Sequence, residues 1–143
     1  MSDVIEDVVA KWHQYLRGDL PDGLDALLAD DVVFLSPIVF TPQQGKEITK
    51  LYLSAAAQTL PGEKSASAGQ GGFRYVKEVL AGTVAVLEFE TTVQGKYVNG
   101  VDIISCNDAG LITEFKVMIR PLQAVNLVHQ QMADMLASMK GDE

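Results

Sequence analysis

The sequence predicts an α+β domain, in which helices pack against a curved antiparallel sheet. Two patterns lead to this class. Apolar residues recur at helical spacing before residue 60 and again after residue 120, whereas residues 73–120 hold strand-like runs joined by very short turns. The length of 143 residues is typical of one domain, so we expect residues 1–143 to fold as a single unit.

Three helices are predicted in the first 60 residues. The first covers residues 3–18, with Asp3 as N-cap and Gly18 as the stop. "LPDGLDALLADD", residues 20–31, follows as a short second helix because its leucines share one face. Residues 41–60 open with turn residues and continue as a third helix.

Strand signals begin with "VVFLSPIVF", residues 32–40, where Pro37 predicts an edge strand or a strand that bends. Residues 62–72 are rich in Gly, Ser and Ala and read as a loop. An antiparallel meander follows, whose strand candidates are residues 73–81, 83–93, 96–105 and 111–120. The chain closes with a helix over residues 121–140 that carries an apolar, methionine-rich stripe.

The charge balance excludes some partners. With 19 acidic and 11 basic residues the net charge is −8, which repels nucleic acid and anionic lipid surfaces. The single cysteine, Cys106, cannot form an intrachain disulfide, and no run of about 18 apolar residues offers a membrane span. The acidic N-terminal segment is unlike a secretory signal, so we expect a cytoplasmic protein.

Asp102 is the main candidate for chemistry. It stands between Val101 and Ile103 in the apolar part of a predicted strand. Burying an unpaired carboxylate costs roughly several kcal/mol of folding free energy, or forces the group to take up a proton. Two interpretations follow: an acid in a pocket, or a carboxylate satisfied by backbone and water at a strand end.

Four phrases, taken in order, resemble the nuclear transport factor two-like superfamily. They are "GDLPDGLDALLADDVVFLSP" (residues 18–37), "GKEITKLYL" (45–53), "VNGVDIISCNDAGLITEF" (98–115) and "VMIRPLQAV" (117–125). The superfamily includes ketosteroid isomerases, limonene epoxide hydrolases and SnoaL-like polyketide cyclases. The resemblance implies a cone-shaped, cystatin-like fold: a curved sheet wrapped around the N-terminal helices, with an added C-terminal helix and a pocket open at one end. It also implies a homodimer.

The same resemblance gives Asp102 a role. It falls where ketosteroid isomerases keep a protonated aspartic acid that donates a hydrogen bond to the substrate oxygen. That register turns Ile104 inward with Asp102, since strand side chains alternate. The isomerase base corresponds here to Ser36, before Pro37, and a serine hydroxyl needs an activating partner to act as a base near neutral pH.

A small-molecule site is therefore expected, with Asp102 as the catalytic acid or base. Its expected wall is largely apolar and consists of Trp12, Tyr15, Phe34, Ser36, Tyr52, Leu87, Phe89, Ile104, Phe115, Val117 and Ile119. Ser36 has the alternative of capping the bend before Pro37, and the tyrosines have the alternative of serving as core residues.

Other polar residues receive mostly structural interpretations. Glu88 and Glu90 should point outward, opposite Leu87 and Phe89. The two histidines do not provide a His-rich metal site, although His129 could border the pocket mouth. Phosphate-binding glycine motifs are absent from the sequence, so we expect neither a metal nor another cofactor.

Two functions are compatible with these residues. The first is a SnoaL-like cofactor-free isomerase, cyclase or lyase that acts on an apolar, oxygen-bearing small molecule through Asp102. The alternative is a non-catalytic ligand-binding or dimerisation module of the same fold. The sequence leaves open whether the chain is an enzyme.

Overall fold

The computed structural model describes residues 3–59 and 72–140. Its helices are α1 (Val4–Leu16), the short 3-10 helix η1 (Gly23–Ala26), α2 (Lys46–Thr59) and α3 (Leu122–Lys140). Its strands are β1 (Leu28–Leu35), β2 (Gln43–Gln44), β3 (Arg74–Ala81), β4 (Val84–Val93), β5 (Lys96–Cys106) and β6 (Ile112–Arg120). The predicted α+β class is confirmed.

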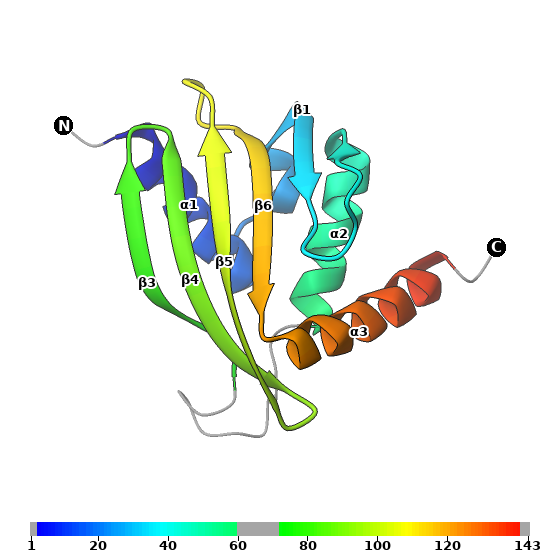
Figure 1. Ribbon diagram of the computed structural model, residues 1–143. Coiled ribbons are helices and arrows are strands. Elements are labelled where there is room, and N and C mark those ends of the chain that lie inside the picture. The colour runs from blue at the N-terminus through cyan, green and yellow to red at the C-terminus, as the bar shows by residue number, and fades with distance from the viewer. Residues whose placement is uncertain (1–2, 60–71, 141–143) are drawn as a thin grey trace.

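Six strands form one curved sheet in the order β2-β1-β6-β5-β4-β3. Strands β3 to β6 are the predicted antiparallel meander. The sheet is nevertheless mixed, because β1 runs parallel to β6 and antiparallel to β2. In Figure 1, α1 lies behind β3–β5, α2 lies beside β1, and α3 starts where β6 ends.

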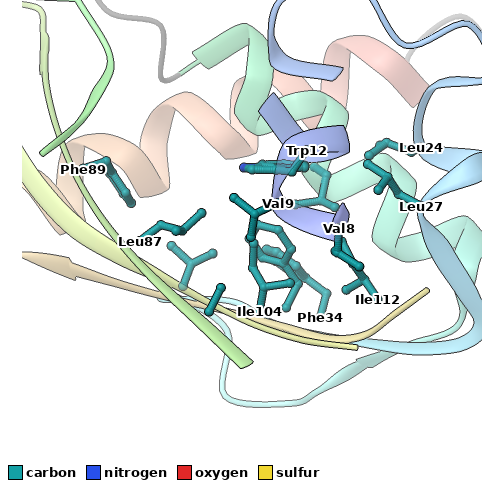
Figure 2. Close-up of a cluster of buried hydrophobic side chains, with 14 of the residues drawn as sticks. Val8, Val9, Trp12, Leu24, Leu27, Phe34, Leu87, Phe89, Ile104 and Ile112 are labelled. Carbon is teal, nitrogen blue, oxygen red and sulfur yellow. The ribbon is translucent and has the colours of Figure 1, made fainter. Parts of the chain in front are cut away.

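Helix α1 covers the inner face of the sheet. It buries Ile5, Val8, Val9 and Trp12, and Figure 2 shows Val8, Val9 and Trp12 above the inward side chains of the sheet. Asp3 is the N-cap, as predicted, and its Oδ2 also accepts a 2.7 Å hydrogen bond from the backbone N–H of Gly82. The first turn of α1 is thereby tied to the hairpin between β3 and β4.

The prediction of a second helix over residues 20–31 is wrong. Only the 3-10 turn Gly23–Ala26 forms, and β1 already begins at Leu28. Leu27 and Leu28 are both fully buried, and the carbonyl of Leu27 accepts a 2.7 Å hydrogen bond from the Ile112 N–H. A short leucine-rich run fits a helix and a buried strand equally well, and pairing with β6 decides for the strand.

Strand β1 also differs from the prediction at its other end. It stops at Leu35, before Pro37, and it is not an edge strand because β2 pairs with it. The predicted loop over residues 62–72 lies outside the described residues, apart from its last residue. Within the parts of the chain that are described, no helix is long and apolar enough to cross a membrane.

Side-chain alternation on the central strands follows the prediction. On β4, Leu87 and Phe89 face inward and are fully buried, whereas Glu88 and Glu90 are partly exposed on the outer face. On β5, Asp102 is buried between the partly exposed Val101 and Ile103. The sheet register therefore points Asp102 toward α1 and the core.

Candidate functional site

Asp102 lies in the middle of the inner face of the sheet. It stands on β5 opposite Leu87 of β4 and Val117 of β6. Its neighbours are apolar, and only 5% of its surface is exposed. β5 continues to Cys106, so Asp102 does not lie at a strand end; that it is an acid in a pocket stays a prediction.

A two-step hydrogen-bond relay reaches Asp102 from α1. The indole Nε1–H of Trp12 donates to the hydroxyl oxygen of Tyr75 over 2.8 Å. The Tyr75 hydroxyl in turn donates to Oδ2 of Asp102 over 2.6 Å. These contacts join α1, β3 and β5, and they supply the polar partner that a buried carboxyl group requires.

Burial controls the protonation of both titratable groups in the relay. Loss of hydration raises the pKa of Asp102 from 3.8 to about 7, although the hydrogen bond from Tyr75 works in the opposite direction. Burial, together with the neighbouring Asp102, holds the pKa of Tyr75 well above 10. Near neutral pH the carboxyl group exchanges between both states, while the phenol keeps its proton.

Aromatic rings surround the relay on both sides. Trp12 stacks on Tyr15 at a centroid distance of 5.4 Å and packs against Phe115 at 5.0 Å. Tyr75 contacts Phe73 edge to face at 5.1 Å, and Phe73 stacks on Phe89 at 5.0 Å. The polar relay is therefore enclosed by apolar surface, which strengthens its hydrogen bonds.

Comparison with solved structures shows which proteins this chain is similar to. No family model matches the sequence, and no curated protein matches it either. A steroid delta-isomerase from Pseudomonas aeruginosa is similar over 99% of this chain and 97% of its own, with 28% identity and a TM-score of 0.84. This similarity supports an NTF2-like, ketosteroid isomerase-like superfamily for the chain.

Two further structures agree with this NTF2-like assignment. A bacterial protein with a cystatin-like fold from Silicibacter pomeroyi shares 28% identity, with a TM-score of 0.74 over 89% of this chain and 83% of its own. An NTF2-like protein of unknown function from Mesorhizobium loti, at 18% identity, shares the fold with a TM-score of 0.65 over 82% and 92% of the two chains. The cystatin-like fold class predicted from the sequence is thus confirmed.

Most wall residues predicted for the NTF2-like site belong to the hydrophobic core or pack against it. They are Trp12, Tyr15, Phe34, Tyr52, Leu87, Phe89, Ile104, Phe115, Val117 and Ile119. Leu87, Phe89 and Ile104 have no exposed surface, whereas Trp12 keeps 5% and Val117 keeps 9%. Trp12 and Val117 thus keep a small solvent-exposed surface, as Asp102 does. Contact of any of these residues with a ligand stays a prediction.

Ser36 has a local role. Its Oγ accepts hydrogen bonds from the backbone N–H groups of Ile38 and Val39 at 3.0 and 3.2 Å. The hydroxyl thus shapes the turn after β1, which is the alternative foreseen for a serine before a proline. Tyr52 stacks on Phe34 at 5.3 Å, as a core residue does.

Tyr75 is the site residue that sequence reasoning missed. Counting back from the hairpin that pairs Ala81 with Val84 places Tyr75 opposite Glu90, on the outer face. The structure pairs Tyr75 with Phe89 instead, because a bulge between Tyr75 and Lys77 shifts the register by one residue. No sequence signal marks this bulge, and without it the tyrosine would point away from Asp102.

The remaining candidates lie outside the relay. His13 forms a 2.9 Å contact with Glu78, and His129 is exposed on α3. Arg120, at the end of β6, donates to Oδ1 of Asn99 over 3.2 Å. Among the described residues, no cluster of three or more His, Cys, Asp and Glu side chains is arranged to hold a metal ion.

An open hollow of about 180 Å³ lies on β5 and β6. It is lined by Asn99, Gly100, Val101, Met118, Ile119 and Arg120. Ile119 is the one predicted wall residue among them, and Asp102 does not border it. This hollow is therefore separate from the candidate acid.

Proposed function

We propose that the chain binds an apolar small molecule through a carbonyl-type oxygen, with Asp102 as the hydrogen-bond donor, and acts as a cofactor-free isomerase, cyclase or lyase. The observation that carries this proposal is a buried carboxyl group, tied to Tyr75, whose pKa is raised to about 7. An acid that stays protonated near neutral pH can donate to a substrate oxygen.

The chemistry follows from where charge develops. In enolisation, cyclisation or elimination next to a carbonyl group, negative charge builds up on the oxygen in the transition state. A donor fixed in an apolar site then binds the transition state more tightly than the substrate. Loss of one such donor typically lowers the rate by about 10²–10³-fold. Asp102 meets these requirements because its apolar surroundings and its Tyr75 contact fix it in place.

The surroundings favour an apolar substrate. The rings beside the relay belong to Trp12, Tyr15 and Phe115, and they offer flat, apolar surface. The similar Pseudomonas aeruginosa protein is a steroid delta-isomerase, so a steroid ketone is a reasonable first probe. The proposal requires a space beside Asp102 that is large enough to admit such a molecule.

One observation favours the non-catalytic alternative. The position that corresponds to the isomerase base holds Ser36, whose Oγ is engaged in a local turn. A single acid without a base polarises a carbonyl group but does not move a proton between carbon atoms. Binding without turnover is the outcome that this alternative predicts.

A homodimer is also proposed, through the outer face of the sheet. Met118, Val79 and Val84 are 49%, 56% and 41% exposed there. Two acids of this face lie beside cations: Glu90 is 2.7 Å from Arg74, and Glu88 is 3.9 Å from Lys77. A face of low net charge on an otherwise acidic chain can approach a second copy without strong repulsion.

Binding and turnover of steroid ketones test the proposal together. We would titrate the protein with a saturated steroid ketone and monitor a β,γ-unsaturated one by the ultraviolet absorbance of its conjugated product. Asp102→Asn should keep a donor and bind, but turn over more slowly, because an amide N–H is a weaker donor than a carboxylic acid to the oxygen on which charge develops. Asp102→Leu should lose both. Asp108→Asn, in the exposed turn after β5, is the matched control and should change neither.

The pH dependence adds a second criterion. Binding of a ketone should weaken as the pH rises through about 7, because the ionised carboxylate no longer donates. Binding without turnover would favour the non-catalytic module. Equal binding by the wild type and Asp102→Leu would refute a role for Asp102.

A further inference from the structure

We propose that Trp12 is a positioning residue that acts through Tyr75: it fixes the acidic proton of Asp102 on Oδ1, the oxygen that Tyr75 does not contact and leaves to the ligand. The presence of a ligand at this oxygen depends on the function proposed above. The relay itself can be tested without any ligand.

The direction of the first hydrogen bond cannot reverse. An indole N–H is a donor only, so the Tyr75 oxygen must be the acceptor of the 2.8 Å contact. Trp12 is 5% exposed and is held between Tyr15 and Phe115, so its ring does not swing away from the contact. The helix therefore presents a fixed donor to the phenol.

The second hydrogen bond follows from the first. With a lone pair of its oxygen occupied by the indole, the Tyr75 hydroxyl directs its one proton toward Oδ2 of Asp102, 2.6 Å away. The phenol keeps that proton, because burial and the nearby carboxyl group raise its pKa. Oδ2 of Asp102 is thus an acceptor in both protonation states.

This arrangement decides where the acid carries its proton. Since Oδ2 accepts from Tyr75, the neutral acid places its proton on Oδ1. An Oδ1–H group selects a ligand atom that accepts a hydrogen bond, such as a carbonyl or ether oxygen. Without Trp12, the Tyr75 hydroxyl could turn and accept from a protonated Oδ2, which would leave only an acceptor toward the ligand.

Tyr75 needs support because of its place in the sheet. It lies beside the bulge of β3, which is the edge strand. Two contacts with His13 of α1 hold this region: the His13–Glu78 contact at 2.9 Å and a T-shaped contact between the His13 and Tyr75 rings, whose centroids are 5.6 Å apart. Helix α1 thus positions both the phenol and the strand that carries it.

The single tryptophan allows a direct test in the wild-type protein. The chain has one indole N–H, which gives one side-chain resonance in a ¹⁵N–¹H spectrum. We expect this resonance to titrate between pH 5 and 9 with the same midpoint as the Asp102 carboxyl carbon. In Tyr75→Phe the indole resonance should no longer follow that titration. An indole resonance that is independent of pH in the wild type would overturn the proposal.

Substitution of Trp12 gives a second readout. Tyr75→Phe should raise the midpoint of Asp102 by about 1–2 pH units, because the ionised form loses a hydrogen bond. Trp12→Phe should raise it by a few tenths of a pH unit, roughly, because the phenol becomes a weaker and less directed donor. Tyr15→Phe removes a hydroxyl beside Trp12 but leaves both relay bonds, so it should leave the midpoint unchanged.

Equal midpoints in Trp12→Phe and Tyr15→Phe would refute the positioning role. If Trp12→Phe does not fold, the wild-type indole titration still decides the question. A protein that neither binds nor converts steroid ketones would refute the proposed function while leaving the relay result standing. The two proposals can therefore fail separately.

Discussion

Replacement of Asp102 by Asn should stabilise the protein at pH 8, although Asp102 is the central residue of the proposed site. The amide has nearly the same shape, and its oxygen can accept the Tyr75 hydroxyl as Oδ2 of Asp102 does. It never carries a charge. The variant therefore avoids the cost of holding an ionised group in an apolar core.

The size of the effect follows from the raised pKa of Asp102. Between about pH 4 and 7 the folded protein binds more protons than the unfolded chain, so wild-type stability falls as the pH rises through this range. A rise from 3.8 to about 7 corresponds to about 4 kcal/mol of lost stability above pH 7. Structural relaxation around the charge makes this an upper value.

Urea denaturation of both proteins from pH 4 to 8.5 measures this difference. The other titrating groups are common to both proteins and cancel in the comparison. The stability of Asp102→Asn relative to the wild type should therefore increase by about 2–4 kcal/mol between pH 4 and pH 8. The exposed variant Asp108→Asn should show no such trend. A stability difference that stays constant over this pH range would mean that Asp102 has an ordinary pKa, and the reasoning would be refuted.

Three further predictions concern the scaffold and the assembly. Gly100→Ala should destabilise the fold by about 1–3 kcal/mol in urea denaturation. The reason is that a Cβ there would lie 2.5 Å from the Met118 carbonyl oxygen and 2.6 Å from the Phe89 ring. Unchanged stability would contradict the tight packing of Phe89 over this strand. Asp3→Ala should cost about 1 kcal/mol in the same assay, because it removes the N-cap and the acceptor of the Gly82 N–H; a neutral result would show that this link contributes nothing. Met118→Glu should convert the proposed dimer to monomer in light scattering, and a dimer that persists would exclude the outer face as its interface.

Much of the fold could be predicted because its patterns are local. The meander depends on alternation and short turns, and the inward positions of Leu87 and Asp102 follow from that alternation. The turn between β5 and β6 is likewise local, since Asn107 closes it with its own side chain. Such features are determined within a few residues along the chain.

Features that depend on distant contacts were not predictable. The start of β1 at Leu28 requires its partner β6, which lies more than 80 positions later in the chain. The inward turn of Tyr75 requires a bulge in β3, and it brings the phenol into contact with Trp12 of α1, more than 60 positions earlier in the chain. The sequence therefore predicted the acid but not the phenol that holds it.

The protonation of Asp102 is the most direct test of this account. A titration of its side-chain carboxyl carbon by ¹³C NMR in the wild-type protein, with Asp102→Asn to assign the resonance, measures it without any ligand. We predict a midpoint near 7, with the neutral acid dominant at pH 6. A midpoint near 4 would show that the carboxyl group is ionised throughout the neutral range, and the proposed hydrogen-bond donor would not exist.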